Sequence, residues 1–319
     1  MDLNRRRPKS SAAALAGAAL SAGMLAAAGM AAAAGGRSAE PASAAPAVTA
    51  AADAQARPRP APVARFDPRR AERQLATQRE ISVSAYERLA PNRPPAPESV
   101  GGDAPVLAVI IDDVGFDAAA LERLLALEMP LTYAVLPYAP DAPEAARRIT
   151  AAGGEVFLHL PMEPAGLEDP GPFAITTAMS ADAVARRAAW ALGRVPGAVG
   201  VNNHMGSRLT ADPYAAARAL SAFAGLDLVF IDSVTTPRSV ASQAAARLGL
   251  ASARRDVFLD HERERDAISA QINTALETAL ARGSAIAIGH PYPETVAALA
   301  SLKARAEAAG VTLVPARQL

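Results

Sequence analysis

The chain has 319 residues and equal numbers of basic and acidic side chains, so its formal net charge is zero. We find no basic stripe with interleaved aromatic residues, so the sequence gives no support for nucleic-acid binding. The absence of cysteine excludes disulfides, cysteine-ligated zinc and a thiol nucleophile.

The N-terminus has the order of an export signal. Basic residues at positions 5–9 precede an uncharged, alanine-rich stretch at 10–36, and the small residues at 32–34 suit a signal peptidase. The stretch is long for a cleaved signal, so an uncleaved membrane anchor is an open alternative. We therefore expect residues 1–36 to be a signal peptide or membrane anchor. The protein is then exported, either periplasmic or anchored to the inner membrane facing the periplasm.

Residues 37–102 have the composition of a linker. Proline and alanine recur there and little apolar surface is available for burial, so we expect this segment to be mostly disordered. A short amphipathic piece at 68–89 is compatible with a helix. The remaining residues, 103–319, are numerous enough to build one sizeable core.

From Val106 onward, short apolar runs alternate with helix-like patterns. Apolar residues step by four from Ile268 to Leu280, and Ser180 is placed to begin a helix. The apolar runs predict strands at 106–113, 131–137, 155–161, 198–204, 226–233, 256–260, 284–290 and 312–315. Continuous apolar strands separated by helices are typical of parallel sheets. We therefore predict an α/β fold, an irregular (β/α) barrel of seven or eight mostly parallel strands.

Polar side chains collect where these predicted strands end. The set is Asp112, Asp113, His159, Asn202, Asn203, His204, Asp232, Asp260 and His290. The carboxyl ends of parallel strands share one rim, where active sites of such folds are built, so we expect these residues to converge. One aspartate and two neutral imidazoles can hold a divalent cation that lowers the pKa of a bound water. The pattern therefore indicates a metal-assisted hydrolase.

Several of these residues also have a structural explanation. Asp112 and Asp113 could cap the following helix, but Asp117 is better placed for that role. Adjacent strand residues point to opposite faces, so only one of the pair can enter a barrel directly, and the other needs an irregular loop. His159 alone is equally compatible with a core histidine. We expect Asp232 to orient a histidine rather than to cap a helix.

Five segments carry a resemblance to a known family. They are VIIDDVG at 109–115, GEVFLHLPME at 154–163, GVNNHMGS at 200–207, FIDS at 230–233 and IGHP at 288–291. Together they resemble the divergent polysaccharide deacetylase family, a branch of the polysaccharide deacetylase superfamily. The resemblance implies an irregular barrel that removes N- or O-acetyl groups from polysaccharides with the help of a metal. It also implies that Asp112 is the base, that Asp113 is a metal ligand and that His290 is the general acid.

The chain departs from the superfamily pattern at the other ligands. The usual His-x-x-x-His motif corresponds to residues 159–163, where Glu163 replaces the second histidine. Either Glu163 or His204 then supplies the missing ligand. We favour His204, because two imidazoles and one carboxylate make a common hydrolytic zinc set. The expected ligands are therefore Asp113, His159 and His204, with zinc as the expected metal.

These features favour a metal-dependent carbohydrate deacetylase-like hydrolase that acts on acetylated envelope polysaccharide or peptidoglycan. One alternative is a non-catalytic glycan-binding or cell-envelope-organising protein that keeps the barrel and the metal site. Another is a metal-dependent hydrolase of a different bond, such as a phosphoester. Its two-metal form would need more clustered carboxylates than the sequence offers.

Overall fold

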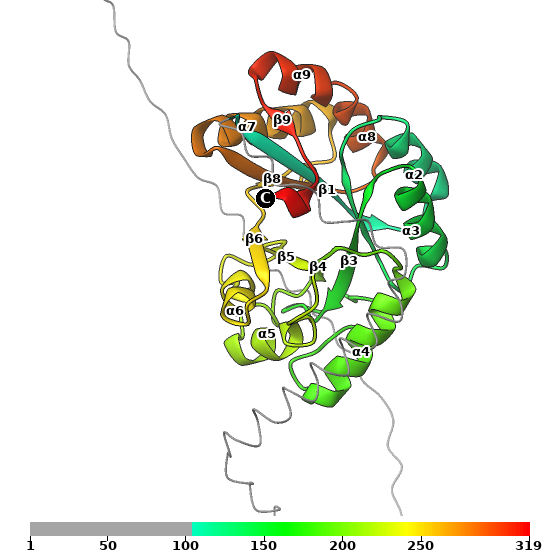
Figure 1. Ribbon diagram of the computed structural model, residues 1–319, viewed down its shortest axis with the longest axis vertical. Coiled ribbons are helices and arrows are strands. Elements are labelled where there is room, and N and C mark those ends of the chain that lie inside the picture. The colour runs from blue at the N-terminus through cyan, green and yellow to red at the C-terminus, as the bar shows by residue number, and fades with distance from the viewer. Residues whose placement is uncertain (1–103) are drawn as a thin grey trace, which may run out of the picture. The chain divides into compact units, whose positions relative to one another are not determined.

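The computed structural model describes residues 104–319, so the expected signal or anchor (1–36) and linker (37–102) lie outside the described residues. Within this part, nine strands form one sheet in the order β6-β5-β4-β3-β2-β1-β8-β7, with β9 paired to β1. Every pairing is parallel, and the sheet curls into a half-barrel (Figure 1). The strands are β1 (Val106–Val114), β2 (Thr132–Val135), β3 (Glu155–Met162), β4 (Gly200–Met205), β5 (Val229–Asp232), β6 (Ala251–Arg254), β7 (Val257–Phe258), β8 (Ser284–Gly289) and β9 (Thr312–Leu313). The predicted α/β barrel class is confirmed.

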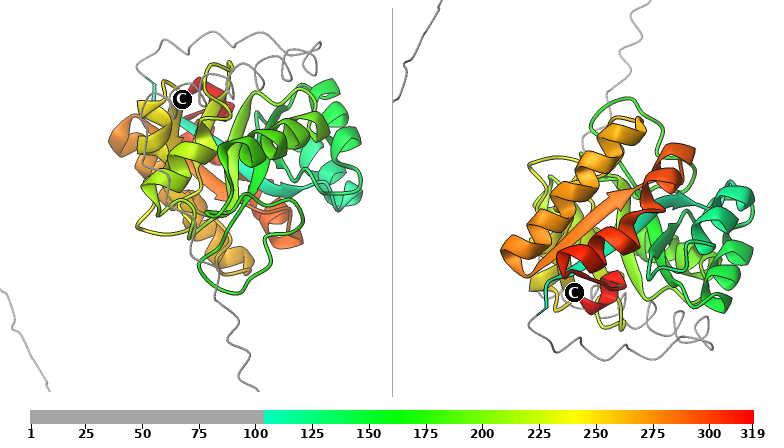
Figure 2. Two further views of the ribbon diagram at one scale, coloured as in Figure 1. Left: turned by 90° about the horizontal axis from the view of Figure 1, so that it is seen from below. Right: turned by 90° about the horizontal axis from the view of Figure 1, so that it is seen from above.

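Helices cover the outer side of the sheet (Figures 1 and 2). For example, α7 packs on β8 and also contacts α9. The helices are α2 (Ala118–Leu125), α3 (Ala142–Ala151), α4 (Ala181–Arg194), α5 (Pro213–Leu220), α6 (Ala241–Arg247), α7 (Arg265–Arg282), α8 (Pro293–Leu299), α9 (Leu302–Ala309) and the 3₁₀ turn η1 (Ala316–Gln318). None of these helices combines the length and the hydropathy that a membrane span requires.

Strand alternation divides the core into two layers. Ile111 belongs to a large cluster between the sheet and the helices, whereas Ile110 and Phe157 belong to a smaller cluster inside the half-barrel. Side chains two residues apart on a strand share a face. Asp112 therefore continues the inner face beyond Ile110, and His159 continues it beyond Phe157. The fold itself carries these two polar groups to the carboxyl end of the inner layer.

The amino end of the inner layer is closed by the C-terminal segment. Ala316 belongs to the inner cluster, and its backbone N–H donates to Thr132 Oγ1 at 2.9 Å. The Thr132 hydroxyl in turn donates to Glu155 Oε1 at 2.8 Å, and the Arg317 N–H donates to the same oxygen at 3.1 Å. The opposite end of the half-barrel, at the carboxyl ends of the strands, is hollowed by a pocket.

The sequence predicted most of these elements but missed β6. That strand, Ala251–Arg254, carries no aromatic or β-branched residue and lies at an edge of the sheet, so it lacks the usual signal of a strand. The helix-start prediction for Ser180 is confirmed, because its hydroxyl accepts from Ala183 N at 3.3 Å. Asp117 caps α2 by accepting from Ala120 N at 2.8 Å, which leaves Asp112 and Asp113 free of that role.

Candidate active site

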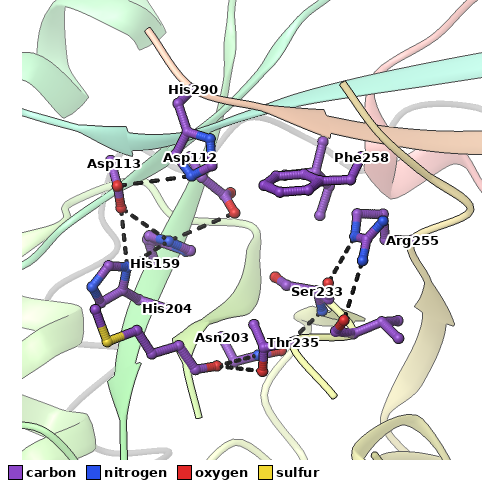
Figure 3. Close-up of a pocket in the computed structure, with 13 residues that line it drawn as sticks. Asp112, Asp113, His159, Asn203, His204, Ser233, Thr235, Arg255, Phe258 and His290 are labelled. Atoms are coloured by element: carbon purple, nitrogen blue, oxygen red, sulfur yellow. Dashed lines mark hydrogen bonds and ion pairs between the residues drawn. The ribbon is translucent and has the colours of Figure 1, made fainter. Parts of the chain in front are cut away.

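A pocket of about 420 Å³ opens at the carboxyl ends of the strands (Figure 3). Six of the residues that the sequence singled out line it, and they come from β1, β3, β4 and the segment after β8. These six are Asp112, Asp113, His159, Asn203, His204 and His290. The shared rim expected from a parallel sheet therefore brings them together, although they span most of the described chain.

The backbone of β1 breaks at the Asp112–Asp113 pair, which lets both carboxylates reach the pocket. The register against β2 shifts between Ile111 and Val114, and Asp113 has a left-handed backbone with φ of 57°. Asp112 enters by normal strand alternation and is buried, whereas Asp113 is turned inward by this irregularity. The sequence argument required such an irregularity for one member of the pair.

Three potential metal ligands meet at the end of the inner face. Asp113 Oδ1 lies 3.0 Å from His204 Nδ1 and 3.3 Å from His159 Nε2, and those two nitrogens are 3.2 Å apart. Asp113 Oδ1 is buried and has no hydrogen-bond partner among the described residues. A divalent cation among these ligand atoms, which all lie within 4.8 Å of one another, would satisfy it, so the cluster could hold a metal.

Asn202 determines which nitrogen of His159 faces this cluster. Its Nδ2 donates to Asp112 Oδ1 at 2.6 Å, which leaves Oδ1 directed at His159 Nδ1 at 2.9 Å. Because an amide oxygen only accepts, His159 Nδ1 carries the proton and Nε2 presents its lone pair to the cluster. The sequence placed Asn202 at the rim but gave it no role, since all of its side-chain partners are distant in the chain.

Glu163, the alternative ligand, is engaged elsewhere. Its Oε2 accepts from the backbone N–H of Thr177 at 2.6 Å and from the hydroxyl of that residue at 2.7 Å. Its Oε1 pairs with Arg208 at 3.3 Å. Burial alone would raise the pKa of Glu163, but the bonds from Thr177 and Arg208 outweigh it and lower the pKa. Glu163 anchors the segment after β3, and His204 takes the place of the third ligand in the cluster.

His290 faces the cluster from the far side of Asp113. Its Nε2 lies 3.8 Å from Asp113 Oδ2, and its Nδ1 lies 2.9 Å from Asp260 Oδ1. Asp260 is fully buried, and its Oδ2 accepts from the His290 backbone N–H and, at 2.8 Å, from the Thr295 hydroxyl. Burial lowers the pKa of His290, but the bond to Asp260 and the nearby aspartates outweigh it and raise the pKa to about 8. This imidazole therefore carries a proton at neutral pH.

Asp232 does not take the role expected from the sequence. Strand alternation turns it away from Ile231, an inner-cluster residue, and its carboxylate bonds instead to the Ser239 hydroxyl at 2.7 Å and the Val234 N–H at 2.9 Å. These contacts fix the turn after β5. The carboxylate that bonds His290 is Asp260, and only the orientation of each side chain in the folded chain separates Asp260 from Asp232.

The two adjacent aspartates have opposite pKa shifts. Burial raises the pKa of Asp112, although the neighbouring histidines oppose this effect. Burial would also raise the pKa of Asp113, but its contacts with His159 and His204 outweigh it and hold the pKa well below its usual range. Burial lowers the pKa of His159, yet the two carboxylates raise it overall, so a proton and a metal compete for the same nitrogen. Neighbouring carboxyls whose pKa values diverge are typical of sites that divide acid–base roles.

Strained backbone gathers around the same pocket. Asp113, Met205 and Val234 all have positive φ, at 57°, 52° and 52°, and all three line the pocket. A left-handed conformation is unfavourable for non-glycine residues and most of all for a β-branched one such as Val234. Strain of this kind persists where the surrounding structure fixes side chains for function.

The fold and this arrangement define the protein class: a parallel α/β half-barrel with a metal-competent aspartate–histidine cluster at the carboxyl ends of its strands. The chain belongs to the divergent polysaccharide deacetylase family, whose family model matches residues 109–319. The family resemblance seen in the sequence is thereby confirmed.

Two relatives that match the chain are uncharacterized proteins. The chain is 38% identical to the uncharacterized protein YibQ of Escherichia coli over 193 residues, which is 60% of either chain. It is 37% identical to an uncharacterized protein of Haemophilus influenzae over 196 residues, 60% of this chain and 69% of that one. The structure of the uncharacterized protein ATU2773 from Agrobacterium tumefaciens matches with a TM-score of 0.66 at 21% identity. That match covers 73% of this chain and 94% of the other, and it supports the fold alone.

Proposed function

We propose that this protein is a metal-dependent deacetylase that hydrolyses acetamide or acetyl ester groups of an envelope polysaccharide. The observation that carries the proposal is the orphaned Asp113 Oδ1 between two imidazole nitrogens. A buried carboxylate, Asp112, and a protonated imidazole, His290, lie in the same pocket. Those are the two proton-transfer groups that acyl hydrolysis requires.

Asp113, His159 and His204 would hold the metal, and their donor set of one carboxylate and two imidazoles fits zinc. A bound divalent ion would supply an acidified water and a positive charge opposite the carbonyl oxygen of the acetyl group. Asn202 holds His159 with its Nε2 lone pair toward the cluster, so the protein prepares the geometry before any substrate binds.

Asp112 is the proposed base. Its Oδ1 is fixed by Asn202, while Oδ2 lies 3.6 Å from His159 Nε2 and so borders the cluster. The carboxylate takes a proton from the water as the water oxygen bonds to the acetyl carbon. Because burial raises the pKa of Asp112, the side chain holds that proton more firmly than an exposed aspartate would.

His290 is the proposed acid. Asp260 accepts from Nδ1 and thereby directs Nε2 into the pocket. As the bond between the acetyl carbon and the amine nitrogen breaks, Nε2 gives its proton to that nitrogen, and acetate and a free amine are left. The raised pKa of His290, about 8, keeps the proton available at neutral pH.

The family supports a polysaccharide as the substrate, and the expected N-terminal signal or anchor would bring the domain to the periplasm. We therefore propose acetylated envelope polysaccharide or peptidoglycan as the substrate. The related possibility of a glycan-binding protein without turnover predicts the same fold and metal but no acetate.

A measurement of acetate release distinguishes a deacetylase from a glycan-binding protein without turnover. Purified protein loaded with zinc is incubated with N-acetylated peptidoglycan fragments and acetylated oligosaccharides, and acetate is quantified. We expect turnover in the wild type and its loss in Asp112→Asn and His290→Gln. The matched control is His261→Gln, because His261 is exposed and lines no part of the pocket. Metal-loaded wild-type protein that releases no acetate from any of these substrates would refute the enzymatic proposal.

A further inference from the structure

Arg255 contributes a fixed positive charge to the pocket. It lies in the short link between β6 and β7, the two strands at the edges of the sheet. Among the described residues that line the pocket, Arg255 is the one arginine, and none is a lysine. Its guanidinium lies across the pocket from Asp113 and His204 (Figure 3). One wall therefore carries the candidate metal ligands, and the opposite wall carries a positively charged side chain.

The structure holds this guanidinium in one orientation. Its Nε donates to the Ser233 carbonyl at 2.8 Å, and its Nη2 donates to the Val234 carbonyl at 3.1 Å. The Phe258 ring supports it from one face, with Cζ 5.1 Å from the ring centroid. These contacts use the side edge of the guanidinium, Nε and Nη2. The terminal edge, Nη1 with the second Nη2 proton, makes no hydrogen bond to any residue of the described part.

A purely structural role for Arg255 explains only the hydrogen bonds made by the side edge of its guanidinium. Tying the link to the turn after β5 requires the two carbonyl contacts and nothing more. The guanidinium is partly buried, burial lowers the pKa of Arg255, and no acidic side chain in the described residues forms an ion pair with it. A preorganised guanidinium with an open terminal edge and no carboxylate paired to it among the described residues, in a pocket, is the arrangement that binds a carboxylate with two parallel hydrogen bonds.

We propose that Arg255 binds a carboxylate of the substrate, so that the preferred ligand is an N-acetylated sugar that also bears a free carboxylate. This inference rests on the proposed function for the acetyl group and adds a second recognition point on the opposite wall. The pocket of about 420 Å³ is of the size that accommodates a small-molecule ligand. Neutral acetylated glycans lack the carboxylate and bind more weakly.

Binding to metal-depleted protein tests this without requiring turnover, so the result is independent of whether the deacetylase reaction occurs. Calorimetric titration compares a disaccharide of N-acetylglucosamine and N-acetylmuramic acid, whose carboxylate is free, with the same disaccharide after reduction of the carboxylate to an alcohol. We expect the acidic form to bind the wild type at least about 10-fold more tightly, and the preference to shrink as salt is added. Equal binding of the two forms by the wild type would overturn the proposal.

Substitutions then test whether the preference for the acidic disaccharide depends on Arg255. Arg255→Gln is expected to bind both forms alike, and Arg255→Lys, which keeps the charge but loses the paired edge, is expected to retain only part of the preference. Arg265→Gln removes the same charge from an exposed position that lines no part of the pocket and should keep the full preference. Melting curves identify any variant that does not fold, and the lysine variant decides the matter if the glutamine variant unfolds. An unchanged preference in a folded Arg255 variant contradicts the assignment, as does tight binding of a phosphorylated but not a carboxylated sugar.

Discussion

Replacing Asn202 by leucine tests the residue that connects Asp112, the proposed base, to His159, an expected metal ligand. The side chain is fully buried, and leucine keeps its branched shape while removing all of its hydrogen bonds. Those bonds run to Asp112 at 2.6 Å, to His159 at 2.9 Å and to the Ser233 hydroxyl at 3.3 Å. The substitution therefore frees both the carboxylate and the imidazole without touching any expected ligand atom.

The size of the effect follows from these contacts. A buried hydrogen bond to a charged group contributes about 1.5–3 kcal/mol, and the neutral one to His159 about 1 kcal/mol, so the free energy of unfolding of metal-free protein should fall by about 2.5–4 kcal/mol. Metal affinity should fall as well, because His159 can then present either nitrogen to the cluster. Loss of such an orienting partner typically weakens metal binding about 10–100-fold.

Zinc affinity is measured by competition with a chromogenic chelator, and stability by urea unfolding. The matched control is Asn203→Leu. Asn203 is equally buried but bonds to the Met205 carbonyl at 2.8 Å and the Ser233 N–H at 2.9 Å, and not to the side chain of any expected ligand. The control should lose stability and keep its zinc affinity. Asn202→Leu protein that binds zinc as tightly as the wild type would refute the orienting role.

Three further substitutions test the packing and backbone of the fold. Burial raises the pKa of Glu155, so its contribution to stability is full below the unfolded pKa and is lost as pH rises through the folded value. Glu155→Gln should therefore be more stable than the wild type at pH 8 and lose that advantage at pH 4 in urea unfolding. Val234→Asn should relieve the positive φ of this residue and raise the free energy of unfolding by about 1 kcal/mol; a decrease would argue against strain. Gly200→Ala should lower the free energy of unfolding by about 1–3 kcal/mol, because the added Cβ would clash with the Phe157 ring. The loss would be seen as a lower melting temperature.

The sequence predicted the fold and the main polar groups because one rule covers both. Apolar strands separated by helices indicate a parallel sheet, and polar residues at strand ends then share a rim. Asp112, His159 and His290 followed from this rule without any knowledge of which strands are neighbours. The irregularity at Asp113 also followed, since two adjacent residues cannot both point inward on a regular strand.

What the sequence did not supply are the contacts between distant segments. Asp260 and Asp232 both follow apolar runs, and only their orientations in the folded chain separate a partner of His290 from a turn-forming carboxylate. Asn202 was visible at the rim, but its bridging role depends on Asp112, which is 90 positions away in the chain. Arg255 lies beside the unrecognised strand β6, so nothing in the pattern placed it in the pocket.

Zinc stoichiometry of the purified protein tests the central claim most directly. We expect one equivalent in the wild type and in Glu163→Gln, because Glu163 is bonded to Thr177 and Arg208 rather than to the cluster. We expect loss of bound zinc in Asp113→Ala and His204→Ala, which remove members of the cluster. A wild type that binds no stoichiometric metal, or a His204→Ala variant that keeps its zinc while Glu163→Gln loses it, would contradict the site described for this protein.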